Sequence, residues 1–400
     1  MSSKPKLIRI TTVPIALKYL LAGQMKYMKE HGFEVLMASA DGTGREDAIR
    51  QEGCPHIIIP MTRKITPFRD LDALWKLYRF FRKERPDIVH SHTPKAGLLS
   101  MIAANWAGVK IRIHTVAGLR FVTAGGIKRK IMVTMEKLTA RNATHVWPNS
   151  FSLFEYIQRK KLVKNDKLEV IGYGSSNGIN LQRFSSTSLE TVHINEVKKL
   201  IAYEPQLTYL LCVGRIVRDK GINELLWAFD KLYSRNDQLR LILVGSFEDD
   251  LDPVSEVSRS ILKNHPGIIM TGWREDVEYF MSLAYALVHP SYREGFPNVL
   301  LQAGSMKCPV ICSRIAGNVD VIDHENTGFI FEPQRKESLL QSLEKALSQP
   351  EKLKVQAGNL RVKIERYFDQ RVVHERIKQR YMELLPAEKK KAIEKLLAVI

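Results

Sequence analysis

The sequence predicts an α/β protein with two doubly wound parallel sheets, one after the other along the chain. Its 400 residues are enough for two or three domains with well-filled cores. Short apolar runs alternate with longer amphipathic segments, and this order indicates βαβ units and therefore parallel sheets. The alternation lapses in the polar stretch near 185–200 and then starts again, so the chain divides into two halves of similar size.

The first half alternates strand and helix candidates from its beginning. Each strand candidate is a short run of aliphatic residues, such as FEVLMA at 33–38, and each helix candidate repeats apolar residues three and four positions apart. The first helix is expected to end at Gly32. Strands are predicted at 7–12, 33–38, 56–60, 87–90, 111–116, 146–148 and 168–171, and helices at 18–30, 48–52, 71–83 and 96–106.

The second half repeats this pattern. LRLILV at 239–244 is aliphatic except for Arg240, which is typical of a short strand. Strands are predicted at 209–213, 239–244, 268–271, 286–289, 310–313 and 328–331, and helices at 222–232, 253–263, 277–284, 299–306, 319–323, 336–347 and 350–367. We therefore expect one Rossmann-like domain at 1–188, a second at 189–368, and a helical segment at 369–400 that packs back on the first domain.

The charge of the chain is strongly basic. Lys and Arg number 61 against 43 Asp and Glu, and a formal net charge of +18 favours nucleic acid, anionic lipid or phosphorylated ligands. Nucleic acid is the least favoured of these, because aromatic and basic residues do not interleave in a stacking platform.

Cysteine usage and hydropathy indicate where the protein acts. The cysteines at 54, 212, 308 and 312 form no CxxC motif, so we expect buried thiols in a reducing compartment. The N-terminal stretch MSSKPKLIRI has no signal-peptide core, and no apolar run nears the roughly 20 residues of a membrane span. A cytoplasmic location is therefore expected.

The stretch 291-SYREGFPNVLLQAGSM-306 places one carboxylate, Glu294, just before a helix start. Gly295 allows a tight turn and a close approach of a ligand to the backbone. Pro297 suits the first turn of a helix, and the apolar run from Val299 continues it. Because free N–H groups at a helix start bind anions, the stretch is either an acid beside a phosphate site or an ordinary strand-to-helix loop.

A second stretch, 211-LCVGRIVRDKGINELLWAF-229, carries two cations on a strand-to-helix loop. The strand ends at Gly214, and Arg215 and Lys220 precede the next helix. Ligands of doubly wound sheets bind at the carboxyl ends of the strands. The fork of an arginine and the point charge of a lysine suit a diphosphate, although such loop cations can also be merely solvated.

Together, these motifs resemble those of the retaining nucleotide-sugar glycosyltransferases of family 4. GRIVRDKG, GWREDV and SYREGFPNVLLQA, which begin at residues 214, 272 and 291, occur in the family's order. In the first half, HSHTPKAGLLSMIAA, RIHTVAGLRF and GSSNGINLQRF, which begin at 90, 112 and 174, are similar to the bacterial branch that makes capsule and O-antigen. The resemblance covers essentially the whole chain and implies the GT-B fold, in which a cleft separates two Rossmann-like domains.

The resemblance implies a donor site in the second half. Arg215 and Lys220 would hold the donor diphosphate and stabilise the leaving group, while Glu294 would bind the sugar hydroxyls. With His114, these three residues form the predicted catalytic set. The predicted donor site comprises Gly214, Arg215, Lys220, Thr271, Gly272, Trp273, Glu294, Gly295, Phe296, Asn298, Val299, Leu300 and Gln302.

Two positions depart from the family's pattern. The second acid of its E-x7-E motif is replaced by Gln302, which still forms hydrogen bonds but lacks the charge, so we expect a weaker grip on the nucleotide. Ala117 stands where many relatives have a histidine that lines the sugar. Without that histidine, His114, Arg120 or a backbone group would be the neighbour of the reacting face of the sugar.

The first half is expected to bind the acceptor. His92, Lys95 and Arg120 follow strands of the first sheet and would line the acceptor side, with Lys95 either near a lipid-linked diphosphate or simply at the surface. A metal is not expected, because His90-x-His92 and Asp250-x-Asp252 offer no third ligand.

The segment 127-IKRKIMVTMEKLTAR-141 mixes basic and apolar residues. On a helix, Ile127, Ile131, Met135 and Leu138 would share one face beside three cations. The segment is either a membrane-docking helix or a core helix with a basic edge, and the net charge favours peripheral contact with the inner face of an anionic cytoplasmic membrane.

The predicted activity is the transfer of a hexosyl or N-acetylhexosaminyl group, with retention of configuration. The donor is expected to be a nucleotide-sugar, most simply UDP-linked, the acceptor a polyprenyl-diphosphate-linked saccharide, and no metal or other cofactor is expected. The alternatives are a nucleotide-sugar epimerase or hydrolase on the same fold, a basic non-enzymatic protein that binds lipid or nucleic acid, and a transferase that the changes at Ala117 and Gln302 have inactivated.

Overall fold

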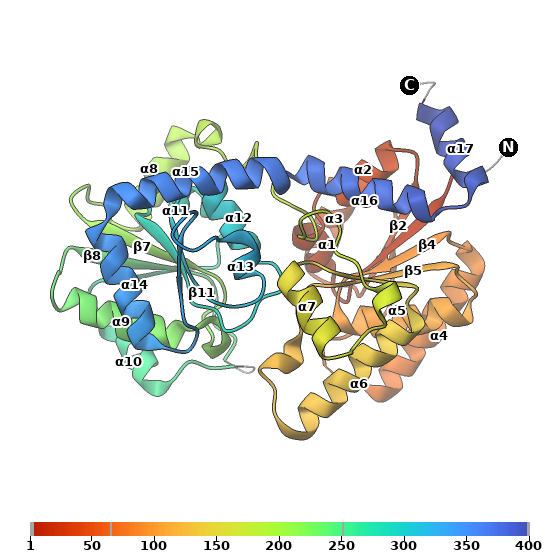
Figure 1. Ribbon diagram of the computed structural model, residues 1–400, viewed down its shortest axis with the longest axis horizontal. Helices are drawn as coiled ribbons and strands as arrows, with labels where there is room; N and C mark the ends of the chain where they lie inside the picture. The colour runs from red at the N-terminus through yellow and green to blue at the C-terminus, as the bar shows by residue number, and fades with distance from the viewer. Residues whose placement is uncertain (1–3, 65, 250–251, 398–400) are drawn as a thin grey trace. The chain divides into compact units, whose positions relative to one another are not determined.

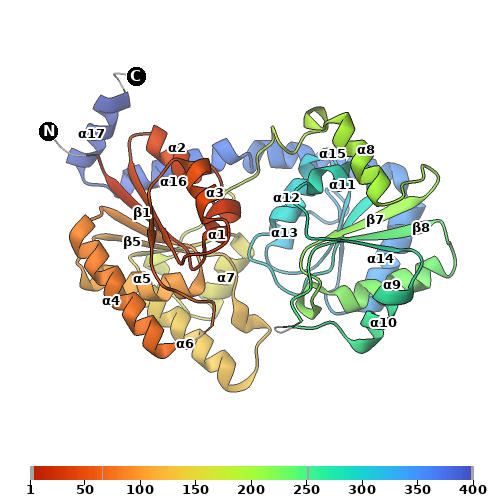
Figure 2. The ribbon, with the colours of Figure 1, turned by 180° about the vertical axis from the view of Figure 1, so that it is seen from behind.

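The computed structural model describes residues 4–64, 66–249 and 252–397, which form two compact units (Figures 1 and 2). The first unit joins Met1–Gly178 with Arg371–Ile400, and the second comprises Ile179–Gln370. The sequence pattern placed the first boundary after residue 188. The structure places it earlier because Ile179 and Phe184 are already buried in the core of the second unit.

The first unit is a parallel sheet with helices on both faces. Its six described strands follow the order β3-β2-β1-β4-β5-β6. They are β1 (Lys6–Ile10), β2 (Glu34–Ser39), β3 (His56–Ile58), β4 (Ile88–Ser91), β5 (Ile111–Val116) and β6 (His145–Pro148). One buried cluster draws on helices α1 (Pro14–Leu20), α2 (Gln24–Glu30), α3 (Arg45–Glu52), α16 (Gln370–Leu384) and α17 (Ala387–Leu397). The cluster on the other face draws on α4 (Pro67–Glu84), α5 (Pro94–Trp106), α6 (Gly126–Asn142) and α7 (Phe151–Arg159).

The second unit repeats the same topology. Its six described strands follow the order β12-β11-β10-β7-β8-β9, which is the order of the first sheet when the strands are numbered within the unit. They are β7 (Thr208–Val213), β8 (Leu239–Val244), β9 (Ile268–Gly272), β10 (Ala286–His289), β11 (Val310–Ser313) and β12 (Phe329–Phe331). One face packs on α8 (Thr191–Leu200), α11 (Val277–Leu283), α12 (Asn298–Ser305), α13 (Asn318–Val321) and α15 (Pro350–Tyr367). The other packs on α9 (Ile222–Tyr233), α10 (Glu256–Asn264) and α14 (Lys336–Ser348).

The strand order positions the functional edge of each sheet. In both sheets the order reverses beside the first strand, between β1 and β4 in the first unit and between β7 and β10 in the second. The loops that leave the carboxyl ends of such a pair diverge to opposite faces, and ligands bind in the crevice between them. The predicted α/β fold with two doubly wound sheets is therefore confirmed.

Three sequence-based predictions of elements were wrong. The strand predicted at 168–171 is absent from the described residues there, where Leu168 makes only an isolated bridge to Val146. The single helix predicted at 18–30 is split into α1 and α2, because Gly23 at the junction adopts φ 77°. The polar stretch near 185–200 contains helix α8, which buries fully only Val197 and so shows little apolar periodicity.

None of the described helices is long and apolar enough to cross a bilayer.

Candidate active site

The switch point of the second sheet brings together the loops that follow β7 and β10. Lys220 lies in the 3-10 turn η4 (Arg218–Lys220), shortly after β7, and Glu294 lies shortly after β10. Their side chains form an ion pair, and both are largely shielded, with 21% and 17% of their area exposed. Two charged residues from separate sequence motifs therefore meet at the edge where this fold binds ligands.

Close backbone packing holds these two loops together. Gly221 adopts φ 69°, and a Cβ atom there would lie 2.1 Å from the carbonyl oxygen of Pro290. The N–H of Tyr292 donates to the carbonyl of Asp219 at 2.9 Å, and the guanidinium of Arg293 pairs with the Asp219 carboxylate at 2.7 Å. The glycine permits this approach because it has no side chain, and the polar contacts fix the two loops against each other.

The surroundings of Glu294 keep its carboxylate ionised. Burial by itself raises the pKa of Glu294, but the charge of Lys220 and the contact with His289 outweigh it, so the pKa lies well below its usual range. His289 is the last residue of β10, and its Nε2 lies 3.3 Å from Oε1 of Glu294. The site thus presents a fixed negative charge beside an ammonium group.

Arg215, the other predicted diphosphate ligand, has a different partner. Its guanidinium pairs with Glu248, in the loop after β8, at 2.5 Å, and about half of the side chain is exposed. The neighbouring loop ends fit tightly, because Gly245 has φ 154° and a Cβ atom there would lie 1.8 Å from the carbonyl oxygen of Gly214. Of the two predicted cations, the structure joins Lys220 to Glu294 and places Arg215 with the next loop along the edge.

Helix α12 starts in the segment that follows β10 at this edge. The side chains of Phe296 and Leu300 are buried in the core, and the N–H of Leu300 already donates to the carbonyl of Pro297 at 3.1 Å. Asn298 and Val299 form the first turn of the helix. The remaining two residues predicted at this helix, Gly295 and Gln302, lie in the loop before it and in its second turn.

The segment predicted to lie beside the base follows β9. Thr271 and Gly272 end the strand, and Trp273 comes directly after it with 57% of its area exposed. The N–H of Gly245 donates to the carbonyl of Gly272 at 2.8 Å, which ties the ends of β8 and β9 together. Thr271, Gly272 and Trp273 therefore lie at the same carboxyl edge as the residues that follow β7.

The carboxyl edge of the first sheet is lined by buried histidines. Nδ1 of His114 lies 2.9 Å from Oγ of Ser91, and the ring packs directly on Gly97 of α5. Burial lowers the pKa of His114 to about 4, so the ring is neutral at physiological pH. Because this ring is enclosed, its position favours a structural role, and the predicted catalytic role stays a prediction.

The three predicted acceptor-side residues, His92, Lys95 and Arg120, have distinct surroundings. His92 is buried, and within the described residues neither of its ring nitrogens has a hydrogen-bond partner. Lys95 is also buried and pairs with Asp70 at 2.7 Å, so it is neither a surface lysine nor a free cation. Arg120 begins the 3-10 turn η1 (Arg120–Val122), and its side chain lies outside the described residues.

The metal-like patterns do not assemble a site among the described residues. No group of three potential metal ligands occurs there. His90 is engaged by other side chains, with Nε2 2.7 Å from Oγ1 of Thr115 and Nδ1 2.9 Å from the Arg9 guanidinium. Asp250, of the second pattern, lies outside the described residues.

Sequence reasoning missed two parts of the charged site. His289 contacts Glu294, and the Asp219–Arg293 ion pair fixes the loops that carry the site. His289 could have been found, because it is the last residue of a predicted strand at the ligand-binding edge. The ion pair has no comparable signal, since it depends on the path of both loops.

Two sheets of Rossmann order, with a charged site at one switch point, define a two-domain α/β protein of the GT-B class. Comparison with known proteins agrees. The family profile described as Glycosyl transferase 4-like domain matches residues 20–174, and the profile described as Glycosyl transferases group 1 matches residues 195–362.

Individual relatives extend this match over the whole chain. The chain is 33% identical over 377 residues to the capsular polysaccharide biosynthesis glycosyltransferase CapM of Staphylococcus aureus, covering 94% of this chain and 96% of that protein. It is 25% identical to the Escherichia coli UDP-Gal:alpha-D-GlcNAc-diphosphoundecaprenol alpha-1,3-galactosyltransferase, covering 96% and 98%. The chain therefore belongs to the glycosyltransferases of bacterial surface-polysaccharide synthesis.

Solved structures show the same fold. A glycosyltransferase from Rickettsia africae has a TM-score of 0.78 at 20% identity, covering 96% of this chain and all of that chain. HepE of Anabaena in complex with UDP-glucose has a TM-score of 0.77 at 17% identity, covering 94% and 99%. The GT-B fold and a glycosyltransferase function, both predicted from the sequence, are confirmed, and neither the epimerase or hydrolase nor the non-enzymatic alternative is favoured.

Proposed function

We propose that this chain is a retaining glycosyltransferase of the family 4 type that transfers a hexosyl or N-acetylhexosaminyl group from a UDP-sugar. The acceptor is a saccharide on polyprenyl diphosphate. The observation that carries the proposal is the Lys220–Glu294 ion pair at the switch point of the second sheet. It supplies a carboxylate for sugar hydroxyls and a cation for phosphate at a single position.

The charged site accounts for the donor half of the reaction. Glu294, held ionised by Lys220, accepts hydrogen bonds from hydroxyls of the donor sugar and orients it. Lys220 faces the diphosphate, and Arg215 reaches it by exchanging Glu248 for phosphate oxygens. As the glycosidic bond breaks, negative charge grows on the leaving diphosphate, and these two cations stabilise that charge.

The anomeric configuration is retained if the acceptor hydroxyl attacks the sugar from the same face from which the diphosphate departs. An oxygen of the departing phosphate then takes the proton of the hydroxyl, and no protein nucleophile is needed. The enzyme contributes positioning and electrostatic stabilisation. Because Lys220 and Arg215 neutralise the diphosphate, the reaction is proposed to need no metal ion.

The choice of donor and acceptor class is supported by the relatives. The Escherichia coli relative is named for UDP-Gal and a diphosphoundecaprenol-linked sugar, and the HepE structure holds UDP-glucose. A Campylobacter jejuni relative, 24% identical over 84% of this chain, is named for an undecaprenol-diphosphate-linked acceptor. We extend both properties to this chain because the match to the two curated relatives spans most of its length.

The acceptor saccharide is proposed to bind at the carboxyl edge of the first sheet. There His92 lines a small pocket with Trp147, Asn149 and Ser175. Within the described residues, the ring nitrogens of His92, Nε1 of Trp147 and Oδ1 of Asn149 have no hydrogen-bond partner. The pocket holds about 10 Å³, the space of one water molecule, and these atoms are shielded, so the saccharide is proposed to bind over this edge with the neutral polar cluster beneath it.

Two neighbouring helices of the first unit are proposed to contact the membrane. Helices α4 and α6 both pack on α5 (Figure 1). Phe68 and Trp75 on α4 are 90% and 57% exposed, and Ile127 on α6 is 77% exposed. Arginines and lysines flank these apolar side chains on both helices, so the helices suit the interface of an anionic membrane.

The test is a panel of nucleotide-sugars scored for release of nucleoside diphosphate, with a bacterial lipid extract as the acceptor. The proposal expects release with a UDP-sugar only when the extract is present, and unchanged release after addition of a metal chelator. Release or epimerisation with donor alone would indicate a hydrolase or epimerase. NMR of the product must show the anomeric configuration of the donor, since the opposite configuration contradicts retention.

A further inference from the structure

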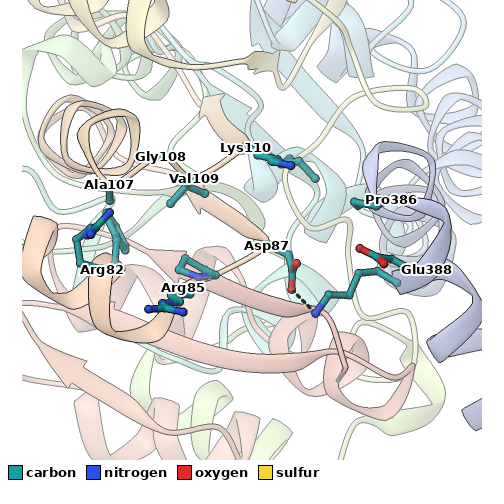
Figure 3. Close-up of a pocket in the computed structure, with 13 residues that line it drawn as sticks. Arg82, Arg85, Asp87, Ala107, Gly108, Val109, Lys110, Pro386 and Glu388 are labelled. Carbon is teal, nitrogen blue, oxygen red and sulfur yellow. Dashed lines mark ion pairs between the residues drawn. The ribbon is translucent and has the colours of Figure 1, made fainter. Parts of the chain in front are cut away.

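A separate basic pocket lies at the opposite edge of the first sheet (Figure 3). It has a volume of about 390 Å³ and sits at the amino ends of β4 and β5, which begin at Ile88 and Ile111. Its walls come from the end of α4, the loop between α5 and β5, and the start of α17. The pocket is therefore distinct from the proposed acceptor site, which lies at the carboxyl ends of these same strands.

The charged side chains around this pocket are unevenly paired. Asp87 accepts a hydrogen bond from the N–H of Lys6 at 2.8 Å and forms an ion pair with Lys389 at 3.3 Å (Figure 3). Within the part of the chain that the structure describes, Arg82, Arg85 and Lys110 form no ion pair and no side-chain hydrogen bond. The rim therefore holds three exposed cations that form no ion pair among the described residues, with the carboxylate of Glu388 as the further acidic group beside Asp87.

The floor of the pocket is apolar and preformed. Phe81, Val109 and Ile111 are buried beneath it, and Pro86 lies beside them. Such a floor limits hydration from below, so charges at the rim act on a ligand more strongly than on a flat surface. Arginine forks bind phosphate oxygens in pairs, and a lysine adds a point charge to them.

We infer that this pocket binds a phosphate-bearing anion, with Arg82, Arg85 and Lys110 as its ligands. The same chemistry has two sources, the headgroup phosphate of an anionic lipid and a free phosphorylated metabolite. Arg82 lies on the same helix as the exposed Phe68 and Trp75. If the ligand is a lipid, its headgroup would therefore bind on the helix that carries these two apolar side chains. The inference does not depend on the proposed transfer reaction, because none of these residues belongs to the donor or acceptor site.

The backbone conformation of Arg85 allows its guanidinium to be removed by mutation without disturbing the end of α4. Arg85 ends α4 with φ 47°, in the left-handed region that favours glycine, and its N–H donates to the carbonyl of Phe81 at 2.9 Å. Replacement by glycine keeps this hydrogen bond and relieves the strained conformation while it removes the guanidinium. The pocket variant is therefore Arg82→Ala, Arg85→Gly and Lys110→Ala combined.

A matched control exists in the second unit. Lys231, Lys263 and Lys307 are exposed, and Lys307 follows α12 with φ 54°, like Arg85 after α4. The control variant combines Lys231→Ala, Lys263→Ala and Lys307→Gly. It removes three positive charges, as the pocket variant does, and it likewise places a glycine where the backbone has a positive φ. Any effect of net charge alone must appear equally in both variants.

The first arm measures binding of inorganic pyrophosphate by calorimetry to the wild type and to both triple variants. Pyrophosphate bound near Lys220 contributes equally in all three proteins, so their differences report the pocket. We expect the pocket variant to bind about tenfold or more weakly and the control to match the wild type. Glu388→Gln removes a negative charge from the rim and should tighten binding. Equal binding by wild type and both triple variants would overturn the inference.

The second arm measures sedimentation with vesicles of equimolar phosphatidylcholine and phosphatidylglycerol. A loss of vesicle binding in the pocket variant, beyond the loss in the control, identifies the lipid headgroup as the source. Unchanged vesicle binding, together with weakened pyrophosphate binding, identifies a free phosphorylated ligand. Transfer activity with a water-soluble acceptor should be the same in all of these proteins, so a failure of the proposed reaction leaves both arms interpretable.

Discussion

The carboxyl edges of the two sheets differ in chemistry although the strands have the same order. At the edge of the second sheet, Lys220 and Glu294 face each other as ions. At the edge of the first sheet, His90, His92 and His114 are buried, and burial, which is the main cause, lowers the pKa of each ring. One topology therefore supports a charged site in one unit and a neutral polar site in the other.

The cause of this difference is the way in which each unit handles buried charge. A buried ion is tolerated when an opposite charge contacts it, as Lys220 does for Glu294. The first unit instead buries the guanidinium of Arg9 among neutral partners, with His90, Gln24 and Tyr381 as its hydrogen-bonding neighbours. After burial, the positive charge of Arg9 is the next cause that lowers the pKa of His90 and of His92. The positive charge of Arg9 thus helps to keep the histidine rings of the first edge neutral.

The largest effect is expected from breaking the ion pair of the second unit. Lys220→Ala and Glu294→Gln should each lower kcat by about 10²- to 10³-fold, because each removes a group that acts on the donor in the transition state. The double variant should lose little more than either single variant, since the two groups act as one unit. Steady-state kinetics with the nucleotide-sugar identified in the panel measure this cycle. Glu332→Gln, in an exposed pair with Arg314, is the control, and additive losses would show that Lys220 and Glu294 act separately.

The neutral edge of the first unit should make that unit sensitive to acid. The pKa of His114 is about 4 in the folded protein and near 6.5 in the unfolded chain, so the unfolded state binds the proton first. Stability is therefore fully present above pH 6.5 and falls as the pH drops to 4, by on the order of 3 kcal/mol for this ring alone. The lowered pKa of Glu294 acts in the same direction but at lower pH, because its contribution to stability is fully present above the ordinary carboxylate pKa and is lost progressively as the pH falls below that value.

Hydrogen exchange, resolved by peptide between pH 7 and pH 4, measures this difference. Peptides of β4 to β6 should lose protection before those of β7 and β10. The variant His114→Asn, which cannot titrate, should flatten the pH dependence of the first unit, whereas the exposed His193→Asn should not. Equal loss of protection in both sheets would mean that the histidines do not set the acid response.

A smaller effect is expected from separating the two loops of the charged site. In Gly221→Ala the new Cβ atom would meet the carbonyl of Pro290 and would also force an alanine to adopt φ 69°. We expect a loss of about 1–3 kcal/mol in the free energy of unfolding, with a fall in kcat as Lys220 shifts from Glu294. Gly126→Ala is the matched control, because Gly126 has φ 55° and open space around it. If the two variants behave alike, the cost comes from the backbone conformation and not from the contact between the loops.

Several elements could be predicted to the residue. Strands β5, β8, β10 and β11 and helix α15 agree with the predicted bounds, because each is a mainly apolar or periodic run. The meeting of Lys220 and Glu294 was also predictable, since both follow strands on the ligand-binding edge and the resemblance gave their roles. Helix α8 was not, because a helix that buries one residue lacks a periodic signal.

The partners of single side chains were not predictable. Arg215 finds Glu248 on the next loop, and Lys95 finds Asp70, which is 25 positions away at the start of α4. Both pairings depend on the paths of loops, which hydrophobic periodicity does not determine. The buried ring of His114 illustrates the same limit, because a strand pattern does not say on which face a given side chain is enclosed.

The smallest effect, and the finest test of the charged edge, concerns Gln302. This residue stands in the second turn of α12, where the resemblance places an acid that binds ribose hydroxyls. Gln302→Glu should lower the KM for the nucleotide-sugar about threefold to tenfold and leave kcat unchanged, because a charge-assisted hydrogen bond holds the nucleotide equally in the ground and transition states. Gln302→Ala should raise KM by a similar factor without a change in kcat. If neither variant changes KM, Gln302 does not contact the nucleotide, and the donor site is limited to the loops that carry Lys220 and Glu294.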